Sequence, residues 1–249
     1  MSKEEQTDFG FSRVTPQQKT EKVKEVFDSV ASRYDLMNDL MSFGMHRLWK
    51  RHVVSIAKLR AGSRVLDLAG GTGDVSRLLA KAMKNTGTVV LSDINQPMLM
   101  LGRDRCIDGN MAQNIVCVQA DAQYLPFADF EFDLVTIAFG LRNVTDKNQA
   151  LREIYRVLKP GAKVLILEFS ELKLASLTGT YDKFSFDILP KLGQLIAKDA
   201  DSYRYLAESI RTHPNQEKLL DMMIGAGFER CKYQNILGGV VAIHEGMRL

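Results

Sequence analysis

The segment Val65–Asp74 of this 249-residue chain combines an apolar run with a loop that could receive a cofactor. It reads VLDLAGGTGD, with glycine at positions 70, 71 and 73. Glycine has no Cβ atom to hold a ligand away from the backbone, and the first N–H groups of a following helix are free to donate hydrogen bonds. The loop is therefore a candidate binding site. A tight turn from a strand into a helix would need the same glycines for structural reasons alone.

Aspartates at three predicted strand ends favour a ligand-binding loop over a purely structural turn. Asp93 comes 20 residues after Gly73, where a carboxylate can accept hydrogen bonds from both ribose hydroxyls. Asp121 ends the following strand and can accept from an adenine amino group beside the Ala122 backbone, while Asp67 can hold a charged amino-acid end. The carboxyl ends of parallel strands lie at one edge of a sheet, so together with Gly71 these residues predict a site for an adenosine with a cationic tail.

The identity of that cofactor follows from what the loop lacks. A dinucleotide fingerprint that starts at Gly71 would need glycine or alanine at position 76, where the chain has Ser76, and there is no GxxxxGK[ST] phosphate loop. S-adenosyl-L-methionine has no phosphate and carries a positive charge, so an acidic loop from Asp67 to Asp74 suits it. A nucleotide-dependent oxidoreductase is the alternative, and methyl transfer against hydride transfer distinguishes the two.

The elements that must position these residues alternate between strand and helix. Buried-strand runs are expected at Arg64–Leu68, Thr88–Ser92, Ile115–Gln119, Phe132–Phe139 and Lys163–Phe169. Helices are expected between them at Asp74–Lys84, Gln96–Ile107 and Asn148–Leu158. Such alternation predicts βαβ units and a parallel sheet. A last helix at Asn215–Ala226 precedes two strands, Cys231–Asn235 and Gly239–His244, that look like a hairpin added to the sheet edge.

One domain is expected, because no repeat, low-complexity tract or linker divides the chain. Residues 1–60 form an N-terminal helical section, with helical spacing from Gln17 to Ile56, and residues 61–170 form the cofactor-binding core. Residues 171–212 are interpreted as an inserted helical lid, and residues 213–249 supply the closing helix and hairpin.

The composition excludes several classes of protein. A net charge of +3 and a pI near 8.7 are too mild to indicate nucleic-acid binding. The three cysteines are widely spaced and include no CxxC pair, and the histidines form no metal-binding cluster, so we expect a reducing compartment and no metal. The N-terminus shows no signal peptide and no apolar run is long enough to span a membrane, which predicts a cytoplasmic protein.

Five segments, the glycine loop among them, resemble one family closely. They are Ser29–Arg51 (SVASRYDLMNDLMSFGMHRLWKR), Val65–Asp74, Ala138–Asp146 (AFGLRNVTD), Tyr155–Ser170 (YRVLKPGAKVLILEFS) and Asp199–Pro214 (DADSYRYLAESIRTHP). Together they resemble the UbiE family of ubiquinone and menaquinone biosynthesis C-methyltransferases over nearly the whole chain. The resemblance implies a class I, Rossmann-like S-adenosylmethionine-dependent methyltransferase fold, with a mostly parallel seven-stranded sheet and a C-terminal antiparallel hairpin.

The same resemblance implies a substrate and a set of cofactor contacts. The substrate would be 2-methoxy-6-polyprenyl-1,4-benzoquinol, demethylmenaquinol, or both, methylated on a ring carbon. Thr72, Asp93, Asp121 and Ala122 are carried over as cofactor-binding residues, and Ala138 as a further contact. Many family members have serine at that last position, so only a backbone or packing contact is expected from Ala138.

Carbon methylation of a quinol needs an activated ring, because ring carbon is a poor nucleophile until an adjacent hydroxyl loses its proton. Arg142 and Asn143, at the end of the fourth strand, fit stabilising and orienting roles there, and Tyr34 can relay the proton through water. Two alternatives stay open from the sequence. Tyr34 can pack with its hydroxyl in solvent, and Arg142 can pair with Asp146 to fix the start of a helix.

The expected partners follow from the lipid-like substrate. A polyprenyl quinol resides in the bilayer, so we expect peripheral contact with the inner membrane, or other members of a quinone-biosynthesis complex that deliver the substrate. A homodimer is also compatible with the sequence, while nucleic acid is not expected. A non-catalytic S-adenosylmethionine-binding subunit of such a complex is a further alternative, which predicts cofactor binding without turnover.

Overall fold

The computed structural model describes residues 6–31, 34–84, 86–173 and 199–249, with four isolated positions between 183 and 194. A seven-stranded sheet forms its centre, in the order β5-β4-β3-β6-β7-β9-β8. The strands are β3 (Arg64–Leu68), β4 (Thr88–Asp93), β5 (Ile115–Gln119), β6 (Phe132–Ala138), β7 (Leu158–Phe169), β8 (Glu229–Ile236) and β9 (Val241–Met247). Neighbouring strands from β5 to β7 are parallel, and β9 is antiparallel to both β7 and β8. The expected parallel sheet with a closing hairpin is confirmed.

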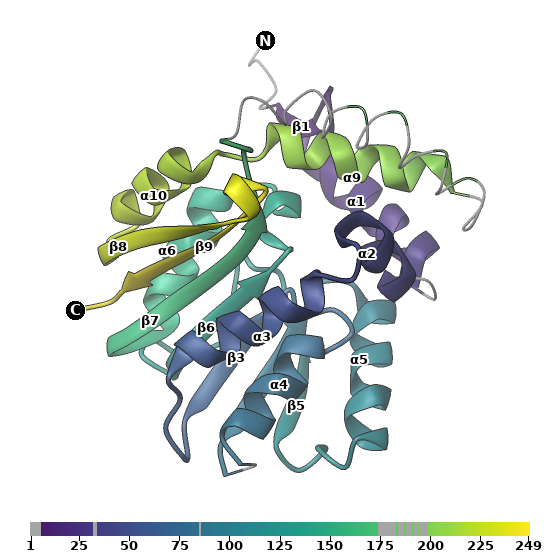
Figure 1. Cartoon of the computed structure of the whole chain (residues 1–249). Coiled ribbons are helices and arrows are strands. Elements are labelled where there is room, and N and C mark those ends of the chain that lie inside the picture. Colours follow the sequence, from purple (N-terminus) through teal and green to yellow (C-terminus); the bar gives the residue numbers. More distant parts are fainter. Residues whose placement is uncertain are drawn as a thin grey trace.

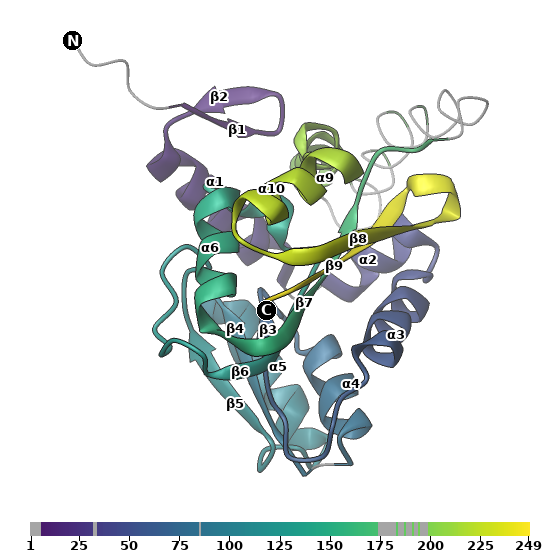
Figure 2. The same ribbon diagram turned by 90° about the vertical axis from the view of Figure 1, so that its left-hand side faces the viewer.

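Helices cover both faces of the sheet, as Figure 1 and Figure 2 show from two sides. The helices are α1 (Pro16–Val30), α2 (Tyr34–Ser42), α3 (His46–Ala57), α4 (Asp74–Ala82), α5 (Gln96–Asp108), α6 (Lys147–Val157), α9 (Ala200–Thr212) and α10 (Gln216–Gly225). One buried cluster joins α3, α4 and α5 to the sheet, and a second joins α6 and α10 to its other face. In Figure 2 the sheet runs edge-on between α6 and α10 on the left and α3 and α4 on the right.

The strand predictions are accurate for two strands of the parallel part of the sheet. β3 and β5 begin and end at the predicted residues. β7 starts five residues earlier than Lys163, because Leu158 already pairs with Phe132 before the register shifts. A short antiparallel hairpin of β1 (Thr7–Phe9) and β2 (Ser12–Val14) was not predicted. Two three-residue strands carry too little periodicity to be read from sequence.

The N-terminal helices lie over the carboxyl ends of the parallel strands, at the top of Figure 1. α1 begins at a capping box, in which Thr15 and Gln18 satisfy each other's backbone N–H groups and Pro16 occupies the first turn. A small third core contains Val30 of α1, Met37 of α2 and Tyr203 and Leu206 of α9. It is therefore α9 that holds the N-terminal helices in place.

Most of the predicted lid, residues 171–212, lies outside the described residues. Its last part is the helix α9, which agrees with the helical expectation there. Among the described helices, none has both the length and the apolar composition needed to cross a membrane.

The glycine loop depends on the close packing of α5. A Cβ atom added to Gly102 would lie 2.5 Å from the Gly71 carbonyl oxygen. We therefore expect Gly102→Ala to push α5 away from the loop, to lower the free energy of unfolding by about 1–3 kcal/mol, and to weaken cofactor binding.

The matched control is Gly225→Ala at the end of α10, where an added Cβ meets nothing within 4 Å. This change should raise the free energy of unfolding by up to about 1 kcal/mol, because alanine loses less entropy in a helix. Urea denaturation measures both effects. Equal stability of the two variants would contradict the packing argument.

Candidate functional site

The glycine loop turns sharply between β3 and α4 with the help of left-handed backbone. Gly71 and Gly73 have φ angles of +52° and +76°, a conformation that disfavours any residue with a Cβ. The Gly70 N–H donates to the Ser92 carbonyl oxygen at 3.0 Å, and the Gly73 N–H donates to the Gly70 carbonyl oxygen at 2.9 Å. These bonds fix the loop to the end of β4.

Asp93 joins the ends of β3 and β4. Its Oδ2 atom accepts from the Gly71 N–H at 2.8 Å, and its Oδ1 atom accepts from the Asn95 N–H at 2.8 Å. Burial raises the pKa of Asp93 to about 6, although these backbone bonds act in the opposite direction. Each carboxylate oxygen keeps a further lone pair, so the group can still accept from two ligand hydroxyls.

Asp121 and Ala122 follow β5 and line the same cavity as Gly71 and Asp93. Gln123 holds the Asp121 carboxylate, because its backbone N–H donates to Oδ1 at 2.9 Å and its side-chain amide contacts both oxygens. The structure thus brings together four of the predicted cofactor residues, drawn from three strand ends.

Four other predicted cofactor residues lie around this cavity without lining it: Asp67, Thr72, Gly73 and Ala138. Asp67 is fully buried beneath the loop and accepts from the hydroxyls of Ser76 at 2.6 Å and Thr136 at 2.8 Å. Burial raises its pKa to about 6. Its observed contacts support the loop from below, and a direct contact with the ligand stays a prediction.

The predicted catalytic residues Arg142 and Asn143 lie in a short 3₁₀ helix, η2 (Leu141–Asn143), after β6. Asn143 lines the cavity. Arg142 is 5% exposed and does not pair with Asp146, so that alternative was wrong. Asp146 instead caps α6 by accepting from the Gln149 N–H at 2.9 Å.

The partner of Arg142 is Glu168, a residue that no sequence pattern indicated. Glu168 lies near the end of β7 and is 1% exposed. Its carboxylate accepts from the Arg142 side chain at 2.8 Å, from the Arg142 backbone N–H at 3.1 Å and from the Phe169 N–H at 2.9 Å. Glu168 therefore anchors η2 to the sheet through the two hydrogen bonds from Arg142.

The N-terminal section closes the cavity from above. Four residues of α1 line it, Thr20, Val23, Lys24 and Phe27, and Tyr34 at the start of α2 joins them. Asn95 donates to Asp28 of α1 at 2.7 Å, and Lys19 donates to the Val144 carbonyl oxygen at 3.3 Å. The predicted site residue Tyr34 is thus beside the cavity, while the contribution of α1 was missed.

The cavity fits the adenosyl part of the cofactor in chemistry better than in volume. Gly71 faces it at a point where an added Cβ would lie 3.2 Å from the Met98 methyl group and 3.8 Å from Asp93. Its volume of about 120 Å³ is smaller than the roughly 300–1,000 Å³ of typical ligand pockets.

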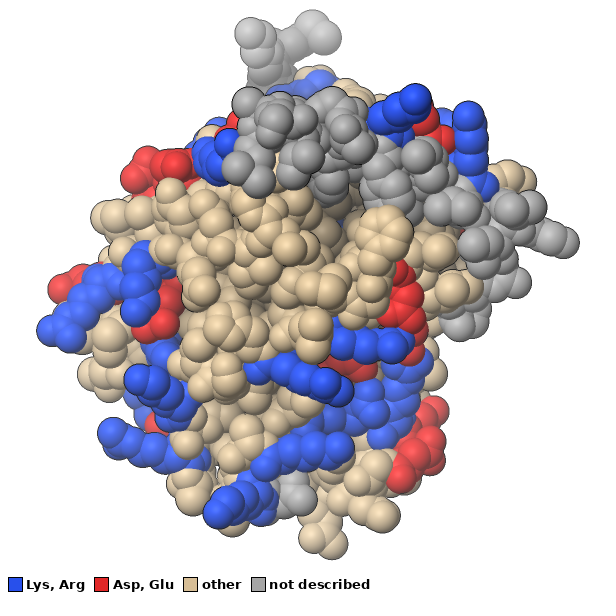
Figure 3. Space-filling model, viewed as in Figure 1, with Lys and Arg blue, Asp and Glu red and all other residues tan. Residues whose placement is uncertain are grey.

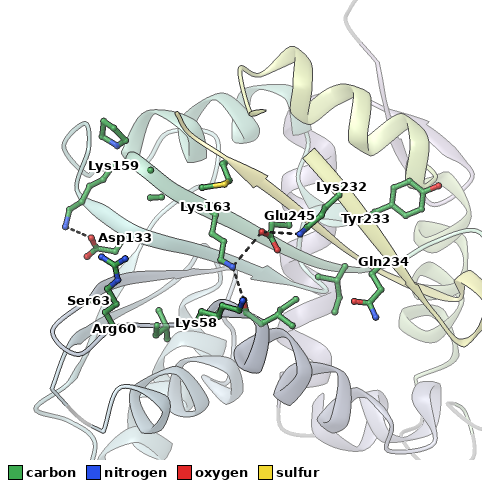
Figure 4. Close-up of a pocket in the computed structure, with 18 residues that line it drawn as sticks. Lys58, Arg60, Ser63, Asp133, Lys159, Lys163, Lys232, Tyr233, Gln234 and Glu245 are labelled. Carbon is green, nitrogen blue, oxygen red and sulfur yellow. Dashed lines mark hydrogen bonds and ion pairs between the residues drawn. The ribbon is translucent and has the colours of Figure 1, made fainter. Parts of the chain in front are cut away.

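A second hollow, which we call the basic groove, has a volume of about 940 Å³ and lies near the amino ends of the parallel strands. Its charged lining residues are Lys58, Arg60, Asp133, Lys159, Lys163, Lys232 and Glu245. Figure 4 shows Lys163 and Lys232 directed toward Glu245, and Lys159 toward Asp133. Cofactors of such sheets bind at the carboxyl ends of the strands, so the groove is not the cofactor site.

The sheet order and the cavity at three carboxyl strand ends define an S-adenosyl-L-methionine-dependent methyltransferase. A solved S-adenosylmethionine-dependent methyltransferase from Aquifex aeolicus has the same fold, with a TM-score of 0.61 and 14% identity over 95% of this chain and all of that one. Phosphoethanolamine N-methyltransferase 2 from Haemonchus contortus, solved with S-adenosyl-L-methionine, matches with a TM-score of 0.60 and 16% identity, over 81% of this chain and 52% of that one.

The chain belongs to the ubiE/COQ5 methyltransferase family, which matches residues 15–248. Among curated relatives, the ubiquinone/menaquinone biosynthesis C-methyltransferase UbiE of Ectopseudomonas mendocina (strain ymp) is 58% identical over 97% of this chain and 94% of its own length. The protein of the same name from Idiomarina loihiensis is 56% identical over 98% of both chains. The resemblance read from the sequence is confirmed.

The raised pKa of Asp93 predicts how cofactor affinity depends on pH. In the predicted contact, ribose hydroxyls would donate to the ionised carboxylate, so binding should favour the form that prevails above about pH 6. Below that pH the free protein holds a proton that binding must displace. Affinity for S-adenosyl-L-methionine should then fall by up to about tenfold per pH unit.

Titration calorimetry between pH 5 and pH 8 measures this dependence. The control is Asp93→Asn, which should bind more weakly throughout and lose the change near pH 6. If the unaltered protein binds S-adenosyl-L-methionine with the same affinity at pH 5 and pH 7, Asp93 does not contact the ligand as an anion.

Proposed function

We propose that this methyltransferase transfers a methyl group to a ring carbon of 2-methoxy-6-polyprenyl-1,4-benzoquinol, of demethylmenaquinol, or of both. The whole-length identity to proteins named for ubiquinone and menaquinone biosynthesis supports this substrate class. The observation that carries the proposal is the cavity itself, which Asp93, Asp121 and Asn143 of η2 line together. One end suits an adenosyl group and the other suits a quinol oxygen.

At the cofactor end, the chain binds and orients the adenosyl group. Asp93 accepts from the ribose hydroxyls, Asp121 and the Ala122 backbone hold the adenine, and the turn at Gly71 permits close approach. Thr72, Gly73, Ala138 and Asp67 complete the binding site in this proposal. When bound, the cofactor supplies an electrophilic methyl group on a positively charged sulfur.

At the quinol end, the chain supplies a hydrogen-bond donor and a path for the proton. Asn143 contacts a quinol oxygen, and Arg142, held by Glu168, keeps Asn143 in place. Tyr34, which lines the cavity below α1, relays the hydroxyl proton to solvent through water, passing on one proton as it accepts another. With that proton gone, the oxygen electrons activate the ring carbon, to which the bound cofactor would supply its methyl group while the carbon–sulfur electron pair stayed with sulfur. The ring then loses its displaced hydrogen as a proton.

A methyl-transfer assay tests the proposal. Purified protein, radiolabelled S-adenosyl-L-methionine and a short-tail demethyl benzoquinol or demethylmenaquinol under reducing conditions should give a C-methylated product. Asp93→Ala should abolish turnover by loss of binding, and Asn143→Ala should lower kcat by about 100-fold with cofactor affinity retained. Cofactor binding without product from either quinol would indicate a non-catalytic subunit instead.

Peripheral contact with an anionic membrane forms part of the proposed function, because the substrate carries a polyprenyl tail. Five cations against two acids in the basic groove supply an excess of positive charge on one face, where Figure 3 shows lysine and arginine side chains gathered in the lower half of the view. The groove lies away from the cavity, so such contact would concentrate the enzyme at the membrane without covering the substrate entrance. A quinone-biosynthesis complex and a homodimer stay predictions.

Vesicle sedimentation tests the membrane contact. Vesicles with 30% anionic phospholipid should retain the protein at low salt and release it at 0.5 M salt, whereas neutral vesicles should not retain it. The double variant Lys58→Glu, Arg60→Glu should lose retention, and the double variant Lys81→Glu, Lys218→Glu, at exposed positions of α4 and α10 outside the groove, serves as a charge-matched control. Equal retention of both variants would exclude the basic groove as the contact.

A further inference from the structure

The side chain of Asn143 is held by a tyrosine from a distant element. Tyr205, in the middle of α9, is 5% exposed, and its hydroxyl donates to the Asn143 Oδ1 atom at 3.0 Å. Its ring stacks on Phe9 of the N-terminal hairpin, with 4.3 Å between centroids and 18° between planes. Burial, this stack and the hydrogen bond to Asn143 together fix the position of the hydroxyl.

The single proton of a phenol decides which way the amide faces. In the described part of the chain, the Tyr205 hydroxyl makes no other hydrogen bond, so its proton goes to Asn143 Oδ1. The amide oxygen is then occupied, and the Asn143 NH₂ group donates to none of the described residues. Asn143 is half-buried and lines the cavity, so its NH₂ group is the part left for a ligand.

We propose that Tyr205 is a positioning residue that makes Asn143 a hydrogen-bond donor to the quinol oxygen rather than an acceptor. This inference rests on the proposed quinol methylation. An NH₂ group stabilises the deprotonated, reactive oxygen, because an oxyanion accepts a stronger hydrogen bond than a hydroxyl does. The opposite orientation would present a carbonyl oxygen, which accepts from the hydroxyl and stabilises the unreactive form.

The Asn143 amide keeps this orientation over the pH range in which the enzyme works. Burial raises the pKa of the Tyr205 hydroxyl well above its usual value, with Arg142 acting in the opposite direction and Glu168 adding to the rise. The hydroxyl therefore keeps its proton and stays a donor. A Tyr205 that lost its proton would attract the Asn143 NH₂ group away from the cavity.

The test is Tyr205→Phe, which keeps the stack on Phe9 and removes only the hydroxyl. We expect kcat to fall about tenfold, the acid limb of the pH–rate profile to move to higher pH, and the affinity for S-adenosyl-L-methionine to stay unchanged. Asn143→Ala should cost more, and Tyr205→Phe should have no further effect in that background. Tyr233→Phe on β8 removes a hydroxyl that donates to Glu217 of α10. This variant should leave turnover unchanged.

A second variant keeps the hydroxyl and changes its acidity. With 3,5-difluorotyrosine in place of Tyr205, the alkaline limb of the pH–rate profile should move to lower pH, because the phenol loses its proton earlier. This second variant tests the positioning role of Tyr205 even if Tyr205→Phe does not fold.

The possible results distinguish failure of the Tyr205 positioning role from failure of the proposed quinol methylation. An unshifted pH–rate profile in both Tyr205 variants, or effects of Tyr205→Phe and Asn143→Ala that multiply, would overturn the positioning role. An unaltered protein that binds the cofactor but methylates no demethyl quinol would instead overturn the proposed function.

Discussion

The hydrogen bond from the Gly71 N–H to the Asp93 carboxylate is the contact on which the rest of the site depends. It exists because parallel β3 and β4 end at the same height, with Leu68 beside Ser92 in register. Gly71 can present its N–H there only with a positive φ angle, and Gly102 lets α5 approach close enough to support the turn. The cost of this arrangement is a buried carboxylate whose pKa is raised to about 6. A ligand that donates two hydroxyls offsets that cost.

A second constraint acts at the other end of the cavity, through the buried pair of Arg142 and Glu168. Removing one partner of such a pair typically costs about 3–5 kcal/mol, because the other charge is left buried without compensation. The backbone N–H groups of Arg142 and Phe169 satisfy the same carboxylate, so η2 has one strongly preferred position. Tyr205 then sets the rotation of the Asn143 amide within it. Position and rotation are controlled by two different elements, β7 and α9.

Much of this could be predicted from the sequence, and the physical reason is locality. Strand runs such as Arg64–Leu68 are visible in their own residues, and parallel pairing brings Asp93 and Asp121 to one edge without further information. The partner of Arg142 is not local. Asp146 is four residues away and Glu168 twenty-six, and nothing in the sequence says that β7 ends beside η2. Tyr205 is still farther in sequence, and only the packing of α9 brings it to Asn143.

The pairing of Arg142 also fits the charge balance of the reaction. The proposed step joins an oxyanion to a cationic methyl donor, so both charges diminish in the transition state. A bare guanidinium facing the oxygen would stabilise the separated charges more than the transition state and would raise the barrier. With Glu168 holding the Arg142 charge, the oxygen meets a neutral amide, which orients it and favours its ionisation at a smaller cost. Acidic groups at the cofactor end and a neutral donor at the quinol end are thus the polarity that a charge-cancelling transfer requires.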